Sequence, residues 1–185
     1  MAEDTTARTL PVSGTWTIDP AHTVIGFRVR HLMAATVRGS FKSFSGKIHI
    51  GDSPEDSRAE VAIDAASIDT GVEDRDRHLR SQDFLDAATH PTLDFASREV
   101  RPVSDGRYQI EGDLTIRGES RPVTLELDYL GLMTDPWGND KALFSATTSI
   151  DREAWGLTWN APLQSGGWLV GKTVDIELEI QASAS

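Results

Sequence analysis

Apolar and polar residues alternate with a period of two along most of this chain, as expected for β-strands that bury one face. The alternation is clearest at residues 108–117, 123–129 and 174–180. The apolar sets of these three segments are Tyr108, Ile110, Gly112, Leu114 and Ile116; Val123, Leu125, Leu127 and Tyr129; and Val174, Ile176, Leu178 and Ile180. Each segment therefore predicts a strand with one apolar face and one solvated face.

Shorter alternating segments, near residues 16–18, 25–29, 44–50, 61–63, 93–95 and 144–150, bring the expected total to eight or nine strands. Glycine and proline residues separate these segments, and short connections favour antiparallel neighbours. Strands of this kind either stack as two sheets or close into a barrel, and closure removes the exposed edges. The sequence alone leaves open whether the inward side chains fill the interior or leave space for a ligand.

One segment has a different pattern. Thr70 followed by Glu73 matches a capping box, and acidic residues near the start with Arg80 near the end suit the helix dipole. We predict a short helix at residues 71–81. Its inward side would carry Arg75 and Asp76 as a pair together with Leu79, and His78 would lie beside Asp74.

Charge and composition narrow the function. Eighteen Lys and Arg residues against 29 Asp and Glu residues give a net charge of −11, which disfavours nucleic acid and anionic membrane surfaces as partners. Without cysteine there are no disulfides, thiolate metal sites or cysteine nucleophiles. We find neither a secretory leader nor a membrane-spanning segment, so we expect a cytoplasmic protein with a disordered tail at 1–13 and one domain at 14–182.

Several motifs, in order, carry a family resemblance. They are Trp16-Thr-Ile-Asp19-Pro-Ala-His22, Gly26-Phe27-Arg-Val-Arg-His31, Val37-Arg38-Gly39-Ser-Phe41, Ser67-Ile68-Asp-Thr70-Gly71, Arg75-Asp76-Arg-His78-Leu79-Arg-Ser81, His90-Pro91-Thr-Leu-Asp-Phe95, Gly112-Asp113-Leu114-Thr-Ile-Arg117-Gly118, Asp135-Pro136-Trp137-Gly138-Asn139, Ile150-Asp-Arg152, Trp155-Gly156-Leu157, and Gly166-Gly167 leading to Val170-Gly171. With these motifs the chain resembles the YceI-like family of lipocalin-like, polyisoprenoid-binding proteins. The resemblance implies an extended eight-stranded antiparallel lipocalin-like β-barrel, often a homodimer. It also implies an apolar tunnel for a long isoprenoid tail, such as that of a polyprenyl phosphate or quinone.

We therefore expect a non-catalytic binding or carrier protein. The inward positions that we expect to line its tunnel are Ile25, Phe27, Val29, Phe44, Ile48, Val61, Ile63, Phe95, Leu114, Ile116, Leu125, Leu127 and Phe144. Trp155, Trp159 and Trp168 bracket the glycine-rich segment 160–167, which we interpret as a mouth loop, where the three rings either clamp a ligand or plug the barrel. His22, His31, Arg38, Arg117 and Arg152 lie at expected strand ends, where they tie loops together or meet a polar headgroup.

An enzyme acting on a lipid-like substrate is the alternative. His22 and His31 flank one expected strand and would lie about 30 Å apart, too far to share a metal ion. No zinc-protease, serine-hydrolase or nucleotide-binding motif occurs. Arg75, Asp76 and His78 are the best candidates for an acid–base site, although an Arg–Asp pair under a helix is more often a structural tie. We expect no catalytic residues, no metal and no cofactor other than a bound lipid.

Overall fold

The structure is a computed structural model that describes residues 10–185. Its strands are β1 (Gly14–Ile18), β2 (Val24–His31), β3 (Ala35–Phe41), β4 (Phe44–Ile50), β5 (Arg58–Asp64), β6 (Ile68–Asp69), β7 (Thr92–Ser104), β8 (Arg107–Ile116), β9 (Glu119–Thr134), β10 (Asp140–Asp151) and β11 (Val170–Ala184). One α-helix, α1 (Glu73–Arg80), and three short 3-10 turns, η1 (Pro54–Asp56), η2 (Ala65–Ser67) and η3 (Arg152–Trp155), complete it. Among the described residues, no helix has the length and hydrophobicity needed to cross a membrane.

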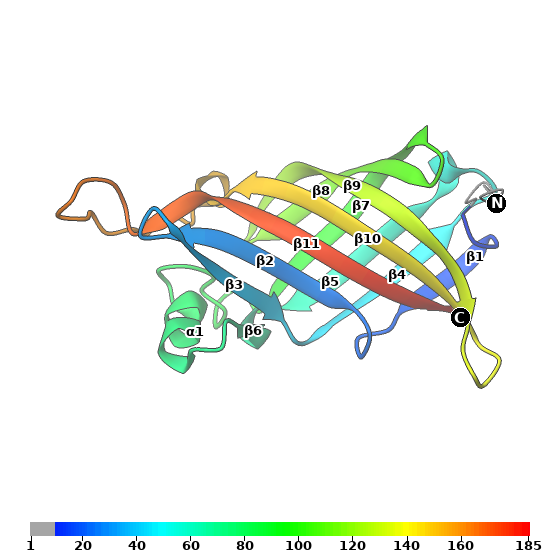
Figure 1. The fold of residues 1–185 in the computed structure, drawn as a ribbon, viewed down its shortest axis with the longest axis horizontal. Helices are drawn as coiled ribbons and strands as arrows, with labels where there is room; N and C mark the ends of the chain where they lie inside the picture. Colours follow the sequence, from blue (N-terminus) through cyan, green and yellow to red (C-terminus); the bar gives the residue numbers. More distant parts are fainter. Residues whose placement is uncertain (1–9) are drawn as a thin grey trace, which may run out of the picture.

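The strands form a closed, eight-stranded antiparallel barrel, as the sequence and its resemblance predict. Two of the eight barrel strands are each interrupted and consist of two shorter strands. β1 and β2 lie end to end along β11, and β3 and β4 lie end to end beside them. From β7 onward each strand pairs with the next, and the β1–β11 pairing closes the circle. Figure 1 shows the long barrel, with α1 at one end and both β1 and the C-terminus near the other. We call these the helix end and the terminal end.

The break between β1 and β2 is bridged by side chains. Pro20 cannot donate to a strand ladder, and here the chain bends away from β11. The Thr23 hydroxyl replaces the missing backbone hydrogen bonds to β11: it accepts from the Gln181 N–H (3.1 Å) and donates to the Gln181 carbonyl (3.3 Å). The break between β3 and β4 has another consequence, because β3 turns to pair with β6 while β4 stays with β5. The wall therefore splays at the helix end.

The alternation predicted from the sequence is the inner face of the barrel. Along β8 and β9 the buried positions are the predicted ones, from Tyr108 to Ile116 and from Val123 to Tyr129. Strand β11 continues to Ala184, slightly beyond the expected end of the domain at 182. At the start of the described chain, Leu10 packs against the core of the terminal end. The rest of the predicted tail, residues 1–9, lies outside the described residues.

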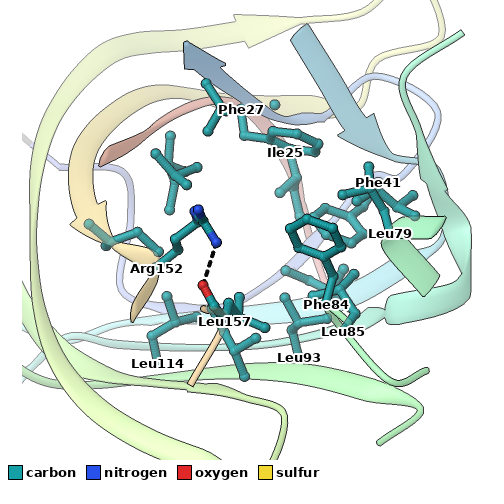
Figure 2. A pocket seen from close by; sticks show the side chains of 18 of the residues that line it. Ile25, Phe27, Phe41, Leu79, Phe84, Leu85, Leu93, Leu114, Arg152 and Leu157 are labelled. Carbon is teal, nitrogen blue, oxygen red and sulfur yellow. Dashed lines mark hydrogen bonds between the residues drawn. The ribbon is translucent and has the colours of Figure 1, made fainter. Parts of the chain in front are cut away.

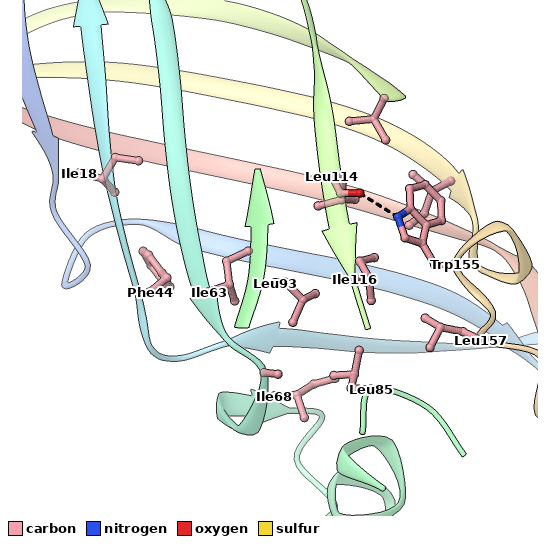
Figure 3. Packing of buried hydrophobic residues seen from close by; sticks show 13 residues of the cluster. Ile18, Phe44, Ile63, Ile68, Leu85, Leu93, Leu114, Ile116, Trp155 and Leu157 are labelled. Carbon is pink, nitrogen blue, oxygen red and sulfur yellow. Dashed lines mark hydrogen bonds between the residues drawn. The ribbon is translucent and has the colours of Figure 1, made fainter. Parts of the chain in front are cut away.

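Two clusters of buried side chains occupy the interior. The cluster at the terminal end includes the aromatic residues Trp16, Tyr129 and Phe144. The second cluster lies toward the helix end, where Trp155 donates to the Leu114 carbonyl (2.9 Å) and Leu85 reaches in from the segment after α1 (Figure 3). Buried apolar side chains therefore occupy both ends of the barrel interior.

The helix begins two residues later than predicted and lacks the expected capping box. Val72 is its N-cap residue and makes no side-chain cap. The Thr70 hydroxyl instead binds the Asp76 carboxylate and accepts from Arg75 Nε (2.7 Å). The predicted direct Arg75–Asp76 pair is therefore wrong, because Thr70 joins the two side chains. His78, one helical turn after Asp74, binds Asp83.

Candidate ligand cavity

A cavity of about 330 Å³ lies inside the barrel at the helix end. This volume is within the range of about 300–1,000 Å³ found for small-molecule sites. Its walls are almost wholly apolar and come from most of the barrel strands, with α1 and the following segment as a cover. Figure 2 shows the side chains of this lining surrounding an open centre.

The exposure of the inward side chains confirms that this end is hollow. Ile25, Phe27, Val61 and Ile176 point inward and pack on the buried cluster, yet each is only partly buried. A side chain in a close-packed interior loses nearly all of its accessible surface, whereas these border empty space. The choice that the sequence left open, between a filled and a hollow interior, is thereby decided for the helix end.

A second, smaller cavity of about 90 Å³ lies toward the terminal end. Six residues border both cavities and form a waist between them: Ile18, Val61, Phe95, Leu125, Leu178 and Ile180. The Phe95 ring packs against the backbone of Gly112, since a Cβ on Gly112 would be only 2.6 Å from the ring.

Aromatic rings close the cavity at the helix end. His78 contacts Trp159 edge-on at 4.5 Å between ring centres, and Phe84 lies 5.1 Å from His78 and 5.5 Å from Trp159. All three side chains line the cavity. The Asp83 carboxylate holds His78 Nε2 at 2.8 Å. These three rings, here called the aromatic cover, come from α1, the segment after it and the loop before β11.

Arg152 is the one deeply buried cation in the described lining, with 3% of its surface exposed. Its guanidinium donates to the carbonyls of Leu157 (2.5 Å), Gly171 (2.8 Å) and Trp159 (3.0 Å), and more weakly to that of Val170 (3.4 Å). Burial lowers the pKa of Arg152 from its ordinary value. The side chain ties the chain on both sides of the mouth loop together and places positive charge beside the cavity.

The distribution of charge in the lining is one-sided. Arg75, Arg152, His31 and His78 line the larger cavity, and no carboxylate lines either cavity in the described residues. This contrasts with the whole chain, in which carboxylates outnumber cations. Electronegative groups of a ligand would therefore be favoured at the helix end.

The structure does not assemble Arg75, Asp76 and His78 into one acid–base site. Asp76 is buried, with 5% of its surface exposed, and accepts from the backbone N–H and the hydroxyl of Thr70. His78 belongs to the separate pair with Asp83. Within residues 10–185, no group of three or more His, Asp or Glu side chains is placed to hold a metal ion.

The structure brings most of the predicted tunnel residues together. Around the larger cavity lie Ile25, Phe27, Val29, Val61, Ile63, Phe95, Leu114, Ile116, Leu125 and Trp159. Ile48, Leu127 and Phe144 lie around the smaller one. Their contact with a ligand stays a prediction.

Three predicted residues lie outside both linings. Phe44 is buried in the core where β4 begins, and Trp155 is held in the core by its bond to Leu114. Trp168, at the end of the loop, is 55% exposed. The three tryptophans thus neither clamp nor plug the mouth together, because only Trp159 reaches it. Asn160 closes the base of this loop by binding the N–H (2.9 Å) and carbonyl (2.7 Å) of Val170.

Sequence reasoning missed the cover. Leu79, Phe84 and Leu85 line the cavity from α1 and the segment after it. The one sequence feature that pointed to a cover was the apolar side of the helix, where Leu79 was expected to face inward. Strand alternation cannot show that a helix covers the end of a barrel. Leu157 and Leu169, from the irregular chain around the mouth loop, were missed for the same reason.

Comparisons with known proteins agree with this architecture. A sequence profile described as the YceI-like domain matches residues 16–182. A UPF0312 protein of Vibrio parahaemolyticus is 36% identical over 132 residues, which cover 71% of this chain and 70% of that protein.

Two solved structures share the fold. BcnA of Burkholderia cenocepacia superposes with a TM-score of 0.75 at 23% identity, covering 89% of this chain and 98% of that one. A polyisoprenoid binding domain from Saccharophagus degradans, described as implicated in plant cell wall breakdown, superposes with a TM-score of 0.70 at 14% identity. This second match covers 94% of this chain and all (100%) of the other.

Proposed function

This chain belongs to the family of YceI-like domains, and on that premise we propose that it is a non-catalytic protein that binds and carries one lipid molecule inside its barrel. The observation that carries the proposal is the apolar cavity at the helix end, whose inward side chains border empty space. A structural neighbour described as a polyisoprenoid binding domain supports a ligand with an isoprenoid-type tail.

The physical chemistry of the cavity favours such a tail. A branched hydrocarbon offers a protein little besides area removed from water, and burial of ten CH₂-sized groups contributes roughly 8 kcal/mol before the costs of binding. The lining is mostly aliphatic and aromatic, and its charged side chains include Arg75 and Arg152. We propose that the tail points toward the waist and that an electron-rich head lies near Arg152.

Extraction of the purified protein tests this proposal. The full chain is purified without detergent, extracted with organic solvent and analysed by mass spectrometry. The expected result is an amphiphile with a prenyl-type tail at close to one molecule per chain. Recovery of no lipid, together with a failure of added prenyl lipids to bind, would contradict the proposal.

We also propose that two copies associate through the outer face of β9. Leu130 and Met133 are 47% and 62% exposed there, although apolar side chains on an outer strand face are otherwise few. The solution mass of the full chain, measured by light scattering, should be that of a dimer. The variant Leu130→Lys/Met133→Lys should shift it to a monomer, and a wild-type monomer would refute the association.

A further inference from the structure

Two loops at the helix end are joined into one projecting structure, here called the tip. The first is the turn between β2 and β3, which contains Leu32 and Met33, and the second is the mouth loop before β11. The Leu32 N–H donates to the Leu169 carbonyl (2.9 Å). Gly167 lies so close to Met33 that a Cβ there would be 3.0 Å from its sulfur. In Figure 1 both loops project beyond the barrel wall, away from the C-terminus.

The tip exposes large apolar side chains. Leu32, Met33 and Trp168 are 51%, 61% and 55% exposed. Leu32 and Met33 also adopt left-handed backbone conformations, with φ of 54° and 66°, which side chains of this size rarely adopt. Exposure and backbone strain are both unfavourable for folding, and such features persist mainly where they serve a function.

The charge around the tip is opposite to that of the whole chain. No Asp or Glu occurs between residues 20 and 51 or between residues 154 and 174, although the chain has 29 of them. Arg30 and Arg38, on the strands that lead to the tip, are exposed, whereas the exposed Lys172 at the start of β11 pairs with Glu153 (3.2 Å). The overall charge of −11 therefore conceals a basic region around an apolar projection.

We propose that the tip docks the barrel onto the surface of an anionic lipid bilayer. A convex group of Leu, Met and Trp side chains with basic neighbours is suited to the headgroup region, where apolar side chains enter and cations meet lipid phosphates. Trp is favoured at this depth because its ring is apolar and its N–H is polar. A protein partner would need a matching pocket, whereas a bilayer accepts a convex projection directly.

The tip adjoins the cavity. His31, Leu169 and Val170 line the cavity, and they are chain neighbours of Leu32 and Trp168. A lipid moving between a docked barrel and the bilayer would thus cross little water. This use of docking rests on the proposed lipid-binding function, but docking itself does not depend on a bound ligand.

Vesicle flotation of the full chain tests the docking. The vesicles are pure phosphatidylcholine or an equal mixture of phosphatidylcholine and phosphatidylglycerol. The wild-type protein should float with the mixed vesicles, and Met33→Asn/Trp168→Ser should weaken this binding about tenfold or more. Asparagine suits position 33 because it tolerates a left-handed backbone. The matched control is Trp137→Ser, since Trp137 is 84% exposed at the opposite end, and it should float like wild type.

Two further comparisons sharpen the test. The variant Arg30→Glu/Arg38→Glu, or added salt, should weaken binding to mixed vesicles. The proposal is overturned by absence of wild-type flotation, by equal loss with Trp137→Ser, or by equal binding to neutral vesicles. A changed solution mass in the tip variant would assign the tip to contact between copies and would also overturn it. A protein that yields extracted lipid but does not float would refute docking and leave the binding function standing.

Discussion

Arg152 shows how a single residue can shape the cavity. Four carbonyls, all from the chain around the mouth loop, receive its donors, so the arginine replaces a strand ladder where the backbone is irregular. A buried carbonyl that is left without a hydrogen-bond donor lowers the stability of the folded state by about 1–3 kcal/mol. The mouth of the cavity therefore depends on this guanidinium.

Replacing Arg152 tests that dependence. We expect Arg152→Met, which keeps an unbranched apolar stem but removes the donors, to lower the free energy of unfolding by about 2–4 kcal/mol. The control is Arg121→Met, because Arg121 is 53% exposed and donates to a single carbonyl of Ala154. Urea denaturation measures both. Equal stability of the two variants would show that the buried donors contribute little.

The cations of the lining also predict which headgroup binds. Prenyl compounds of one chain length that end in phosphate, alcohol or amine share the same tail, so differences in affinity report the head alone. Because Arg75 and Arg152 face the cavity without a carboxylate, the phosphate should bind about tenfold more tightly than the amine. The alcohol should lie between them. Competition against a fluorescent lipid measures this order, and tighter binding of the amine would reverse the proposed orientation.

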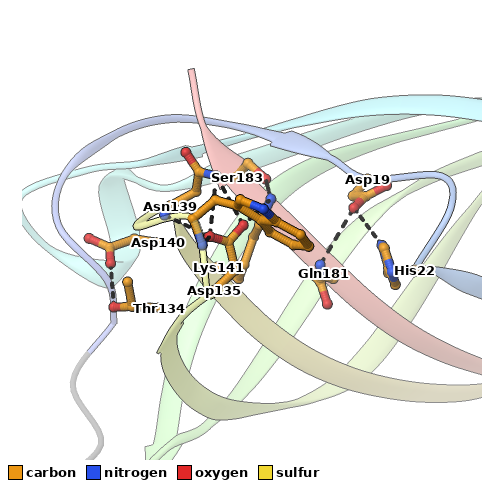
Figure 4. A network of polar contacts seen from close by, with 10 residues as sticks. Asp19, His22, Thr134, Asp135, Asn139, Asp140, Lys141, Gln181 and Ser183 are labelled. Carbon is orange, nitrogen blue, oxygen red and sulfur yellow. Dashed lines mark hydrogen bonds and ion pairs between the residues drawn. The ribbon is translucent and has the colours of Figure 1, made fainter.

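Asp135 gives the terminal end a dependence on pH. Hydrogen bonds from the Asn139 side chain, followed by those from the backbone of Asn139 and Trp137, lower the pKa of Asp135 below its ordinary value of 3.8 (Figure 4). A lowered pKa in the folded state stabilises the protein above the ordinary value, and this contribution disappears as the pH falls through the lowered pKa.

The prediction concerns how the difference in stability between wild type and Asp135→Asn changes with pH. Wild type should be more stable than Asp135→Asn at neutral pH, and the two stabilities should converge as the pH falls below about 4. Unfolding by urea at a series of pH values measures the gap. A gap that is constant across this range would exclude ionisation of Asp135 as its cause.

At the scale of elements, the strands were far more predictable than the cover. Strands β8, β9 and β11 have unbroken alternation because one face of each meets the apolar interior, and their inner faces were assigned correctly. The helix at 73–80 was found to within two residues at its start. The contacts that anchor the helix were not predicted, because Thr70 binds Asp76 and Arg75 where the local pattern suggested a capping box.

The remaining errors arise from contacts that are distant in the chain. Alternation shows which side of a strand is inward but not the level of the barrel at which a residue lies. Phe44 and Phe95 are both inward, yet only Phe95 reaches a cavity, because β4 begins at the point where the wall splays. The position of Trp155 likewise depends on a bond to Leu114, 41 residues earlier.

The anchor of α1 makes the cover testable. Asp76→Ala removes the acceptor for both donors of Thr70 and should loosen the helix, which would raise hydrogen exchange at 73–80 and speed release of bound lipid severalfold. Asp74→Ala is the matched control, since the side chain of Asp74 is 90% exposed on the same helix. Equal release rates from the two variants would mean that α1 does not control access.

At the scale of the whole molecule, an acidic exterior surrounds two cavities whose lining, within the described residues, has no carboxylate. Glu126, Asp128, Glu177 and Glu179 occupy outward positions on β9 and β11, whereas the inner face presents aliphatic and aromatic side chains and a few cations. The larger cavity lies at the helix end and the smaller one toward the terminal end, so the space for the proposed ligand is mainly at the helix end. The central claim is that this space holds a lipid.

A pair of substitutions on β10 tests that claim most directly. Thr148 lines the larger cavity, and Thr147 is exposed on the outer face opposite Glu126 and Glu177. Native mass spectrometry of the gently purified full chain measures bound lipid in Thr148→Trp and Thr147→Trp, two variants with the same change of residue. The indole at position 148 should displace most of the lipid, and Thr147→Trp should retain the wild-type amount. Equal lipid in both variants would contradict the claim.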